Sequence, residues 1–242
     1  MPRPPAPQVK PVASRGPSMG LIGGVVVLAV LLIAALVWAA TRGSGLDATG
    51  STSTLPEGGG VSVGPGVDAD VMQIRVYEDP QCPWCARLEN SIGQGLDDLV
   101  ASGEANVTYQ IMSFLDGGGS DRSSSRAANA MLCADEAGRF TAFHGELFAD
   151  PAAQAHQGYT DDQLMGWARS AGISGDAEDT FATCIAEEPH QDYVRDMQER
   201  ANKDGVTGTP TVFVNGEELS NEEISLLLED GSQLEQVLQS HA

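Results

Sequence analysis

The chain has 242 residues, of which 13 are Lys or Arg and 34 are Asp or Glu, so its formal net charge is −21. Four of the basic residues and none of the acidic ones lie before residue 43, which leaves the rest of the chain with a charge of −25. Such an acidic surface excludes nucleic acid as a partner and disfavours docking on anionic lipid.

An uncharged apolar segment of 20 residues, Leu21–Ala40, follows a Pro-rich segment (residues 1–20) that contains three basic residues and no acidic one. As a helix it would be about 30 Å long, which matches the hydrocarbon core of a bilayer. The basic flank predicts a single transmembrane helix in the cell membrane, with a cytoplasmic N-terminus and an extracytoplasmic catalytic domain. A signal peptide cleaved near Ala39 is the alternative, but the segment is longer than the apolar region of such a peptide.

Residues 41–60 are rich in Gly, Ser and Thr, which predicts a flexible linker. The remaining residues, 61–242, suffice for one domain or for one domain with an insertion. At its start Val71–Tyr77 alternates like a β-strand, and apolar side chains from Leu88 to Leu99 recur at helical spacing.

The sequence Cys82-Pro83-Trp84-Cys85 lies at the junction of this strand and this helix. The dipole and free N–H groups of the first helical turn would favour a thiolate on Cys82, and a thiolate attacks disulfides whereas a thiol does not. Cys85, one turn further on, could then resolve the mixed disulfide. The pattern therefore predicts a redox-active disulfide that works without a metal, nucleotide or organic cofactor.

The spacing of Cys82 and Cys85 also suits half of a zinc site. The other half would need two more ligands nearby, whereas the remaining two cysteines are single and the four histidines are scattered. Redox chemistry is the favoured interpretation.

The middle of the chain predicts helices. After a helix end at Gly103, Asn106–Phe114 predicts a second strand, and residues 120–203 then have helical patterns that include a capping box, Thr160-Asp-Asp-Gln163. A crossover between parallel strands needs about a dozen residues, so a segment of this length is interpreted as an inserted helical domain.

The C-terminal part begins with Gly208-Thr209-Pro210-Thr211, followed by a short strand and an Asn215-Gly216 turn. Because proline lacks an N–H group, Pro210 must lie at the end of the strand or at a bend. Capping boxes beginning at Ser220 and Ser232 predict two short terminal helices or one broken helix.

Together, the Cys-x-x-Cys, the helical insertion and the X-Pro loop resemble the DsbA-like thiol:disulfide oxidoreductases of the thioredoxin superfamily. The resemblance covers roughly residues 61–240 and implies an α/β thioredoxin fold with an inserted helical domain. It implies that Pro210 follows a cis peptide bond and packs against the Cys-x-x-Cys, and that the Thr209 backbone binds an extended substrate segment. The dipeptide Pro83-Trp84 also looks DsbA-like, with Trp84 providing an apolar surface beside the reactive sulfur.

The other two cysteines, Cys133 and Cys184, lie within the helical insertion. In an exported chain a remaining even pair predicts a structural disulfide, here between helices 51 residues apart in sequence. Two buried free thiols and a second redox centre are the alternatives. Related DsbA-like proteins include members with such a disulfide.

Ionisable residues near the motif suggest a proton relay. Thioredoxin-fold enzymes often have a buried acid under the active site, so Glu78 and Asp79 are candidates, although an acid at the mouth of the site would equally serve solubility. The histidines His144, His156 and His190 are expected at helix surfaces or interfaces, without a chemical role.

The resemblance implies an extracytoplasmic enzyme that introduces disulfide bonds into exported polypeptides. A membrane protein of the DsbB or vitamin K epoxide reductase type would reoxidise it. A disulfide isomerase or reductase, with the same dithiol kept reduced by its partner, is the nearer alternative. A non-enzymatic, chaperone-like binding module is the more distant one.

Overall fold

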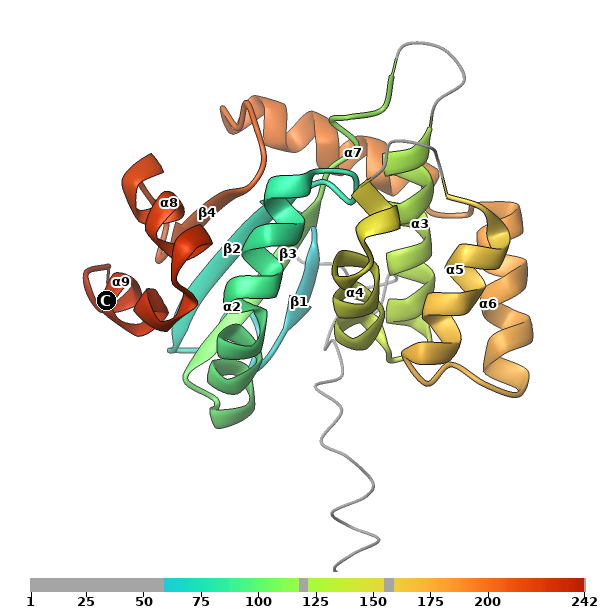
Figure 1. Ribbon diagram of the computed structural model, residues 1–242, viewed down its shortest axis with the longest axis horizontal. Helices are drawn as coiled ribbons and strands as arrows, with labels where there is room; N and C mark the ends of the chain where they lie inside the picture. Colours follow the sequence, from blue (N-terminus) through green and yellow to red (C-terminus); the bar gives the residue numbers. More distant parts are fainter. Residues whose placement is uncertain (1–58, 118–121, 155–158, 242) are drawn as a thin grey trace, which may run out of the picture. The chain divides into compact units, whose positions relative to one another are not determined.

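The computed structural model describes residues 59–117, 122–154 and 159–241 (Figure 1). The predicted transmembrane helix, Leu21–Ala40, and almost all of the predicted linker lie outside the described residues. Within the part that is described, no helix is long and apolar enough to cross a membrane.

A five-stranded sheet forms the centre of the domain, with the strand order β1-β3-β2-β4-β5. Its two central strands, β2 and β3, are parallel, and every other pairing is antiparallel. The strands are β1 (Val61–Val63), β2 (Met72–Glu78), β3 (Ala105–Ile111), β4 (Thr211–Val214) and β5 (Glu217–Glu218).

Helix α2 (Pro83–Ser102) connects β2 to β3 and packs on one face of the sheet. It does so because Leu88, Ile92 and Leu96 recur every four residues and form a buried stripe. As predicted, Gly103 ends the helix, in a left-handed conformation (φ 76°) that glycine adopts without strain.

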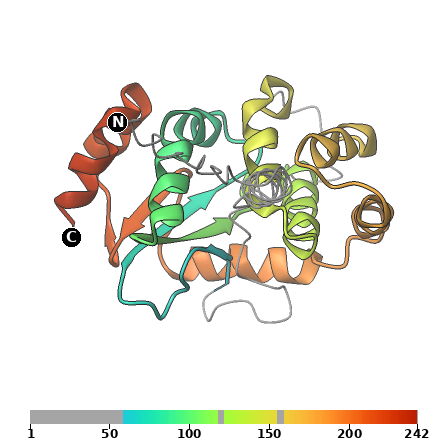
Figure 2. The same cartoon turned by 90° about the horizontal axis from the view of Figure 1, so that it is seen from below.

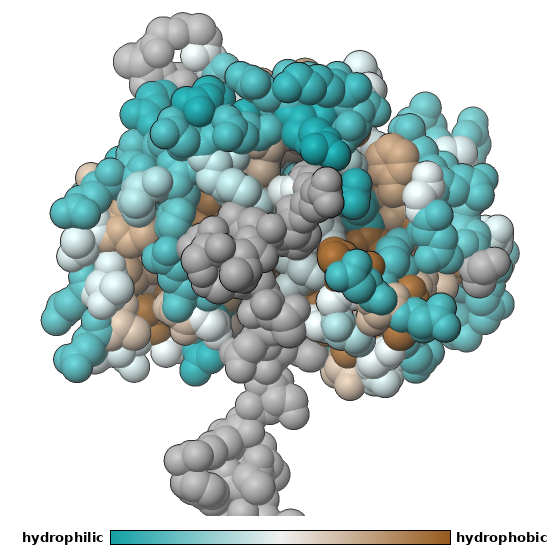
Figure 3. All heavy atoms as spheres, turned by 180° about the vertical axis from the view of Figure 1, so that it is seen from behind, coloured by the Kyte–Doolittle hydropathy of each residue, from teal (hydrophilic) through white to brown (hydrophobic). Residues whose placement is uncertain are grey.

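Helix α7 (Gln191–Lys203) lies on the opposite side of the sheet from α2 (Figure 2). Its buried residues Val194, Met197 and Ala201 recur at helical spacing, which orients its other side toward solvent. Hydrophilic residues dominate this part of the surface (Figure 3), in keeping with the charge of the chain.

The inserted helices lie between β3 and β4, where the sequence predicts them. The helices before α7 are α3 (Ser123–Glu136), α4 (Phe140–Ala149), a 3-10 helix (Pro151–Gln154), α5 (Asp161–Ser170) and α6 (Asp176–Glu187). The predicted capping box at the start of α5 is confirmed, since the Thr160 hydroxyl accepts a hydrogen bond from the Gln163 N–H and the Gln163 side chain accepts one from the Thr160 N–H. Helix α4 packs against α2, which brings the insertion next to the Cys-x-x-Cys.

The C-terminal segment follows the prediction in part. The Asn215-Gly216 turn joins β4 to β5, and the capping box of Ser220 begins α8 (Asn221–Glu229). The box predicted at Ser232 is wrong: a 3-10 helix (Gly231–Gln233) precedes α9 (Leu234–Gln239). The physical reason is that the Asp230 carboxylate accepts hydrogen bonds from both the backbone N–H and the hydroxyl of Ser232, so this hydroxyl does not cap α9.

Candidate active site

Cys82 and Cys85 lie at the beginning of α2. Cys82 is the N-cap residue, and Pro83 occupies the first helical position, where its missing N–H and restricted φ favour helix initiation. Both cysteines are free thiols, with exposed fractions of 5% and 2%. The predicted helix start at the motif is therefore confirmed.

The two sulfur atoms differ in their electrostatic surroundings. The largest effect on Cys82 is a hydrogen bond from the Cys85 thiol, and the Thr209 side chain and the first N–H groups of α2 add smaller ones. Together these hydrogen bonds outweigh burial and lower the pKa of Cys82 to about 6. Burial, together with the hydrogen bond and charge of Cys82, raises the pKa of Cys85 well above its usual value. At neutral pH this arrangement gives one thiolate that can attack and one thiol that keeps its proton.

The loop before β4 lies against the reactive sulfur. The Thr209–Pro210 peptide bond is cis, and Cys82 Sγ lies 3.4 Å from the Thr209 carbonyl oxygen, to which it donates when it is protonated. Trp84, two residues after Cys82, has 54% of its surface exposed and so presents an apolar surface to solvent. The Arg87 guanidinium lies 5.9 Å from the centre of the Trp84 ring. The structure thus brings Cys82 and the Thr209–Pro210 loop together, as the resemblance implies.

Both candidate acids are buried, which rules out the alternative that they serve solubility at the mouth of the site. The Asp79 carboxylate accepts hydrogen bonds from the Gln81 and Leu115 N–H groups and from the Ser124 hydroxyl. Burial nevertheless raises the pKa of Asp79 to about 6. With three donors already bound, its carboxylate ties together the loops that follow β2 and β3.

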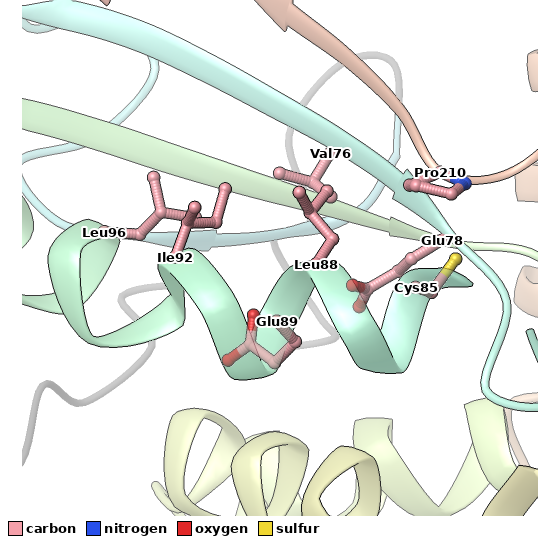
Figure 4. Close-up of a pocket in the computed structure, with 8 residues that line it drawn as sticks. All are labelled: Val76, Glu78, Cys85, Leu88, Glu89, Ile92, Leu96 and Pro210. Atoms are coloured by element: carbon pink, nitrogen blue, oxygen red, sulfur yellow. The ribbon is translucent and has the colours of Figure 1, made fainter. Parts of the chain in front are cut away.

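Glu78, the last residue of β2, lies beside Cys85 (Figure 4). Burial is the main cause that raises the pKa of Glu78. The two side chains line one cavity of about 10 Å³, close to the volume that holds a single water molecule. The residues around the cavity are Val76, Glu78, Cys85, Leu88, Glu89, Ile92, Leu96 and Pro210.

His144 is a site residue that the sequence interpretation missed. It lies at a helix interface, one of the two expected placements, but it is 1% exposed and contacts carboxylates, with Nε2 2.7 Å from Glu78 Oε1 and Nδ1 3.4 Å from Glu89 Oε1. The signal was its position within α4, four residues from Phe140 and from Phe148, so that it shares their buried face.

His190 is partly buried at a helix interface, as expected. It lies at the start of α7, with Nε2 3.6 Å from Cys184 Sγ and 3.4 Å from Glu136 Oε1. His156 falls outside the described residues.

The second cysteine pair forms a disulfide. Cys133 on α3 and Cys184 on α6 are bonded, so the predicted structural bridge within the insertion is confirmed. With His190 these sulfur atoms form a cluster of donors within 4.8 Å. Because the sulfur atoms are bonded to each other, they are not thiolate ligands for a metal.

The fold and the site define a thioredoxin-fold protein with a reactive dithiol. The sequence pattern of the family described as thioredoxin matches residues 66–230, and the chain belongs to this family.

Several solved structures are similar to the domain. They include the reduced disulfide bond oxidoreductase DsbG of Mycobacterium tuberculosis, at 28% identity and a TM-score of 0.54, covering 73% of this chain and 88% of that one. Reduced DsbA of the same organism has 28% identity and a TM-score of 0.53, with 74% and 93% covered. The thiol-disulfide oxidoreductase MdbA of Corynebacterium diphtheriae shares the fold, at 23% identity and a TM-score of 0.59, with 70% and 88% covered.

The curated relatives are similar over a shorter part. The serine/threonine-protein kinase PknE of M. tuberculosis is 29% identical over 133 residues, which is 52% of this chain. The matched part is only 22% of the length of that relative.

Proposed function

We propose that the chain is a membrane-anchored thiol:disulfide oxidoreductase of the DsbA type that introduces disulfide bonds into exported polypeptides. The observation that carries the proposal is the asymmetry of the dithiol: Cys82 has a pKa of about 6, while Cys85 is buried and stays protonated. Such a pair releases a stable thiolate when its disulfide is reduced, which is the property of an oxidant. The similarity to DsbA and DsbG supports the same chemistry.

In the oxidising cycle a substrate thiolate attacks Cys82 Sγ of the Cys82–Cys85 disulfide. The bond between the two cysteines breaks, and Cys85 leaves and takes a proton. A second substrate thiolate then attacks the substrate sulfur of the mixed disulfide, and Cys82 leaves as a thiolate. The substrate gains a disulfide, and the protein keeps two electrons. A membrane partner of the DsbB or vitamin K epoxide reductase type then accepts these electrons.

The surroundings of the dithiol suggest how the substrate and the proton are handled. An extended substrate segment would pair with the backbone at Thr209 and pack on Trp84. Glu78 lines the same cavity as Cys85 and is the proposed proton relay. Asp79, whose carboxylate already accepts three hydrogen bonds, is the less suitable of the two acids.

Oxidative refolding of reduced ribonuclease A tests the activity. The protein oxidised at Cys82 and Cys85 should restore ribonuclease activity in proportion to the amount added. Cys82→Ser should be inactive, and Cys85→Ser should accumulate mixed disulfides because the resolving thiol is missing. Failure to oxidise the substrate, together with rapid reduction of insulin by the dithiol form, would favour the reductase alternative.

Labelling of intact cells tests the location. After mild reduction of living cells, a membrane-impermeant maleimide should modify Cys82 in the full-length chain. Labelling only after the cells are lysed would contradict an extracytoplasmic domain.

A further inference from the structure

A buried ion cluster connects the inserted helical domain to the dithiol. Both ring nitrogens of His144 face carboxylates, with Nε2 2.7 Å from Glu78 and Nδ1 3.4 Å from Glu89. A neutral imidazole has a single N–H, whereas an imidazolium donates from both nitrogens. The geometry therefore suits a protonated ring held between two carboxylates.

Aromatic side chains fix this ring and keep water away from it. The ring centres of Tyr109, Phe148 and Phe140 lie 4.6, 4.8 and 5.5 Å from that of His144. They come from β3 and from α4 itself, and all three are buried. The ring has little freedom to turn away from its carboxylate partners.

The other ionisable groups around the cluster are acidic. Besides burial, the charges of Glu89 and Asp79 raise the pKa of Glu78. Burial and then the charge of Glu89 raise the pKa of Asp97 on α2, whereas His144 lowers it. Tyr109 is a buried phenol whose pKa is raised, mainly by burial. Although burial alone would lower it, the charges of Glu78 and Glu89 raise the pKa of His144 to about 10. His144 is thus the cation that balances this group of acids among the described residues.

Glu89 extends the cluster toward solvent. It follows Cys85 by one turn of α2, and both side chains line the cavity with Glu78. The Glu89 side chain is 18% exposed, whereas those of Glu78 and His144 are 3% and 1% exposed. Glu89 is therefore the cluster residue with the most access to solvent.

We propose that His144 is a positioning residue that holds Glu78 and Glu89 at the cavity beside Cys85, and that Glu89 is the exit through which the Cys85 proton reaches solvent. This inference rests on the proposed function and adds to it a role for the helical insertion. When Cys85 resolves a mixed disulfide, its proton passes to Glu78 and its sulfur bonds to Cys82. The bond from Cys82 to the partner sulfur breaks, and the partner leaves as a thiolate. The partner sulfur is thereby reduced and the Cys85 sulfur is oxidised, so the electrons balance within the exchange.

Stopped-flow reaction of the reduced protein with Ellman's reagent, between pH 5.5 and 9, separates the two thiols. The first thionitrobenzoate is released by attack of Cys82, and the second by closure of Cys85 onto Cys82. We compare the wild type with His144→Gln and Glu89→Gln. The matched control is His190→Gln, which removes another histidine that faces a carboxylate in the insertion.

The second release should slow about tenfold or more at pH 7 in both cluster variants, less than the roughly 10²–10⁴-fold loss of a general acid or base itself, because Glu78 stays in place. In His144→Gln its pH midpoint should also rise by about one unit, because loss of the cation raises the pKa of Glu78, which is then already protonated at pH values where the wild type can accept the proton. Glu89→Gln keeps this cation and should show the slower release without the rise. The first release should stay within about twofold of the wild type, and His190→Gln should change neither phase. A merely structural role for His144 would not move the pH midpoint of one phase alone.

An unchanged second release in folded His144→Gln and Glu89→Gln would overturn the inference while leaving the proposed function intact. If His144→Gln does not fold, Glu89→Gln alone decides the test. The Glu89 side chain is partly exposed, so its replacement by Gln is compatible with folding. A wild type in which Cys85 never closes onto Cys82 would instead contradict the proposed function.

Discussion

The acidity of Cys82 comes from a few neighbouring groups. The Cys85 thiol and the first N–H groups of α2 stabilise the thiolate, and a disulfide sulfur gains nothing from them. The same groups that lower the pKa of Cys82 therefore also make the Cys82–Cys85 disulfide easier to reduce, which makes it a stronger oxidant.

Titration of the thiolate absorbance of the reduced protein tests this property. We expect a transition with a midpoint at about pH 6, against about 8.5 for a free cysteine. Cys82→Ser should lack this transition. A midpoint above about 8 in the wild type would contradict the proposed thiolate.

At the scale of residues, the sequence predicts Cys82, Cys85 and Pro210 because each belongs to a short motif with its own chemistry. It does not predict the contacts of His144, which lies 66 residues from Glu78 and meets it only because α4 packs against α2. Burial is likewise invisible in the motif, and for this reason Glu78 and Asp79 are compatible with either a relay or a surface role before the fold is known.

At the scale of elements, local signals explain both the correct and the wrong boundaries. Gly103 ends α2 as predicted because a left-handed cap needs no distant partner. The short strand β1 is missed, since three residues carry no periodicity and it forms only by pairing with β3. The predicted second strand continues to Phe114, but β3 ends at Ile111, and the Met112 N–H bonds to the Glu78 carbonyl.

Gly231, between α8 and α9, offers a test of how tightly the C-terminal segment packs. A Cβ atom at Gly231 would lie 2.0 Å from the Ser91 carbonyl oxygen of α2, which is backbone and cannot move aside as a side chain could. Gly231→Ala should therefore lower the free energy of unfolding by about 1–3 kcal/mol in urea denaturation.

The control is Gly166→Ala in the middle of α5, where a Cβ atom would meet nothing within 4 Å. Alanine is a better helix former than glycine, so this change should raise stability by about 0.5–1 kcal/mol. Equal effects of the two substitutions would show that the contact with Ser91 is not rigid.

At the scale of the whole molecule, the Cys133–Cys184 bridge constrains the unfolded chain, because it closes a loop over a separation of 51 residues. On the chain-entropy model, Cys133→Ala with Cys184→Ala should lower the free energy of unfolding by about 3–4 kcal/mol. Urea denaturation of both proteins, oxidised at Cys82 and Cys85, measures the difference. A loss below about 1 kcal/mol would show that the bridge contributes little to stability.

Reduction of the active-site pair should make the stability of the domain depend on pH. The pKa of Cys82 falls on folding from the roughly 8.5 of a free cysteine to about 6, so its contribution is fully present above about pH 9 and is lost as the pH falls through 6. The oxidised form has no such group. The excess in melting temperature of the reduced over the oxidised form should grow between pH 6 and 8, with Cys133–Cys184 intact in both. A difference that is independent of pH would contradict the assignment of the thiolate.

The central claim is that the Cys82–Cys85 disulfide is an oxidant, and its reduction potential tests this most directly. A disulfide is a strong oxidant when the thiolate formed by its reduction is stabilised. Equilibration of the purified protein in glutathione buffers of known ratio, followed by acid trapping and alkylation, gives this potential. We predict a value between about −180 and −120 mV, the range from protein disulfide isomerase to DsbA. A value near the roughly −270 mV of thioredoxin would contradict the claim and identify the chain as a reductase.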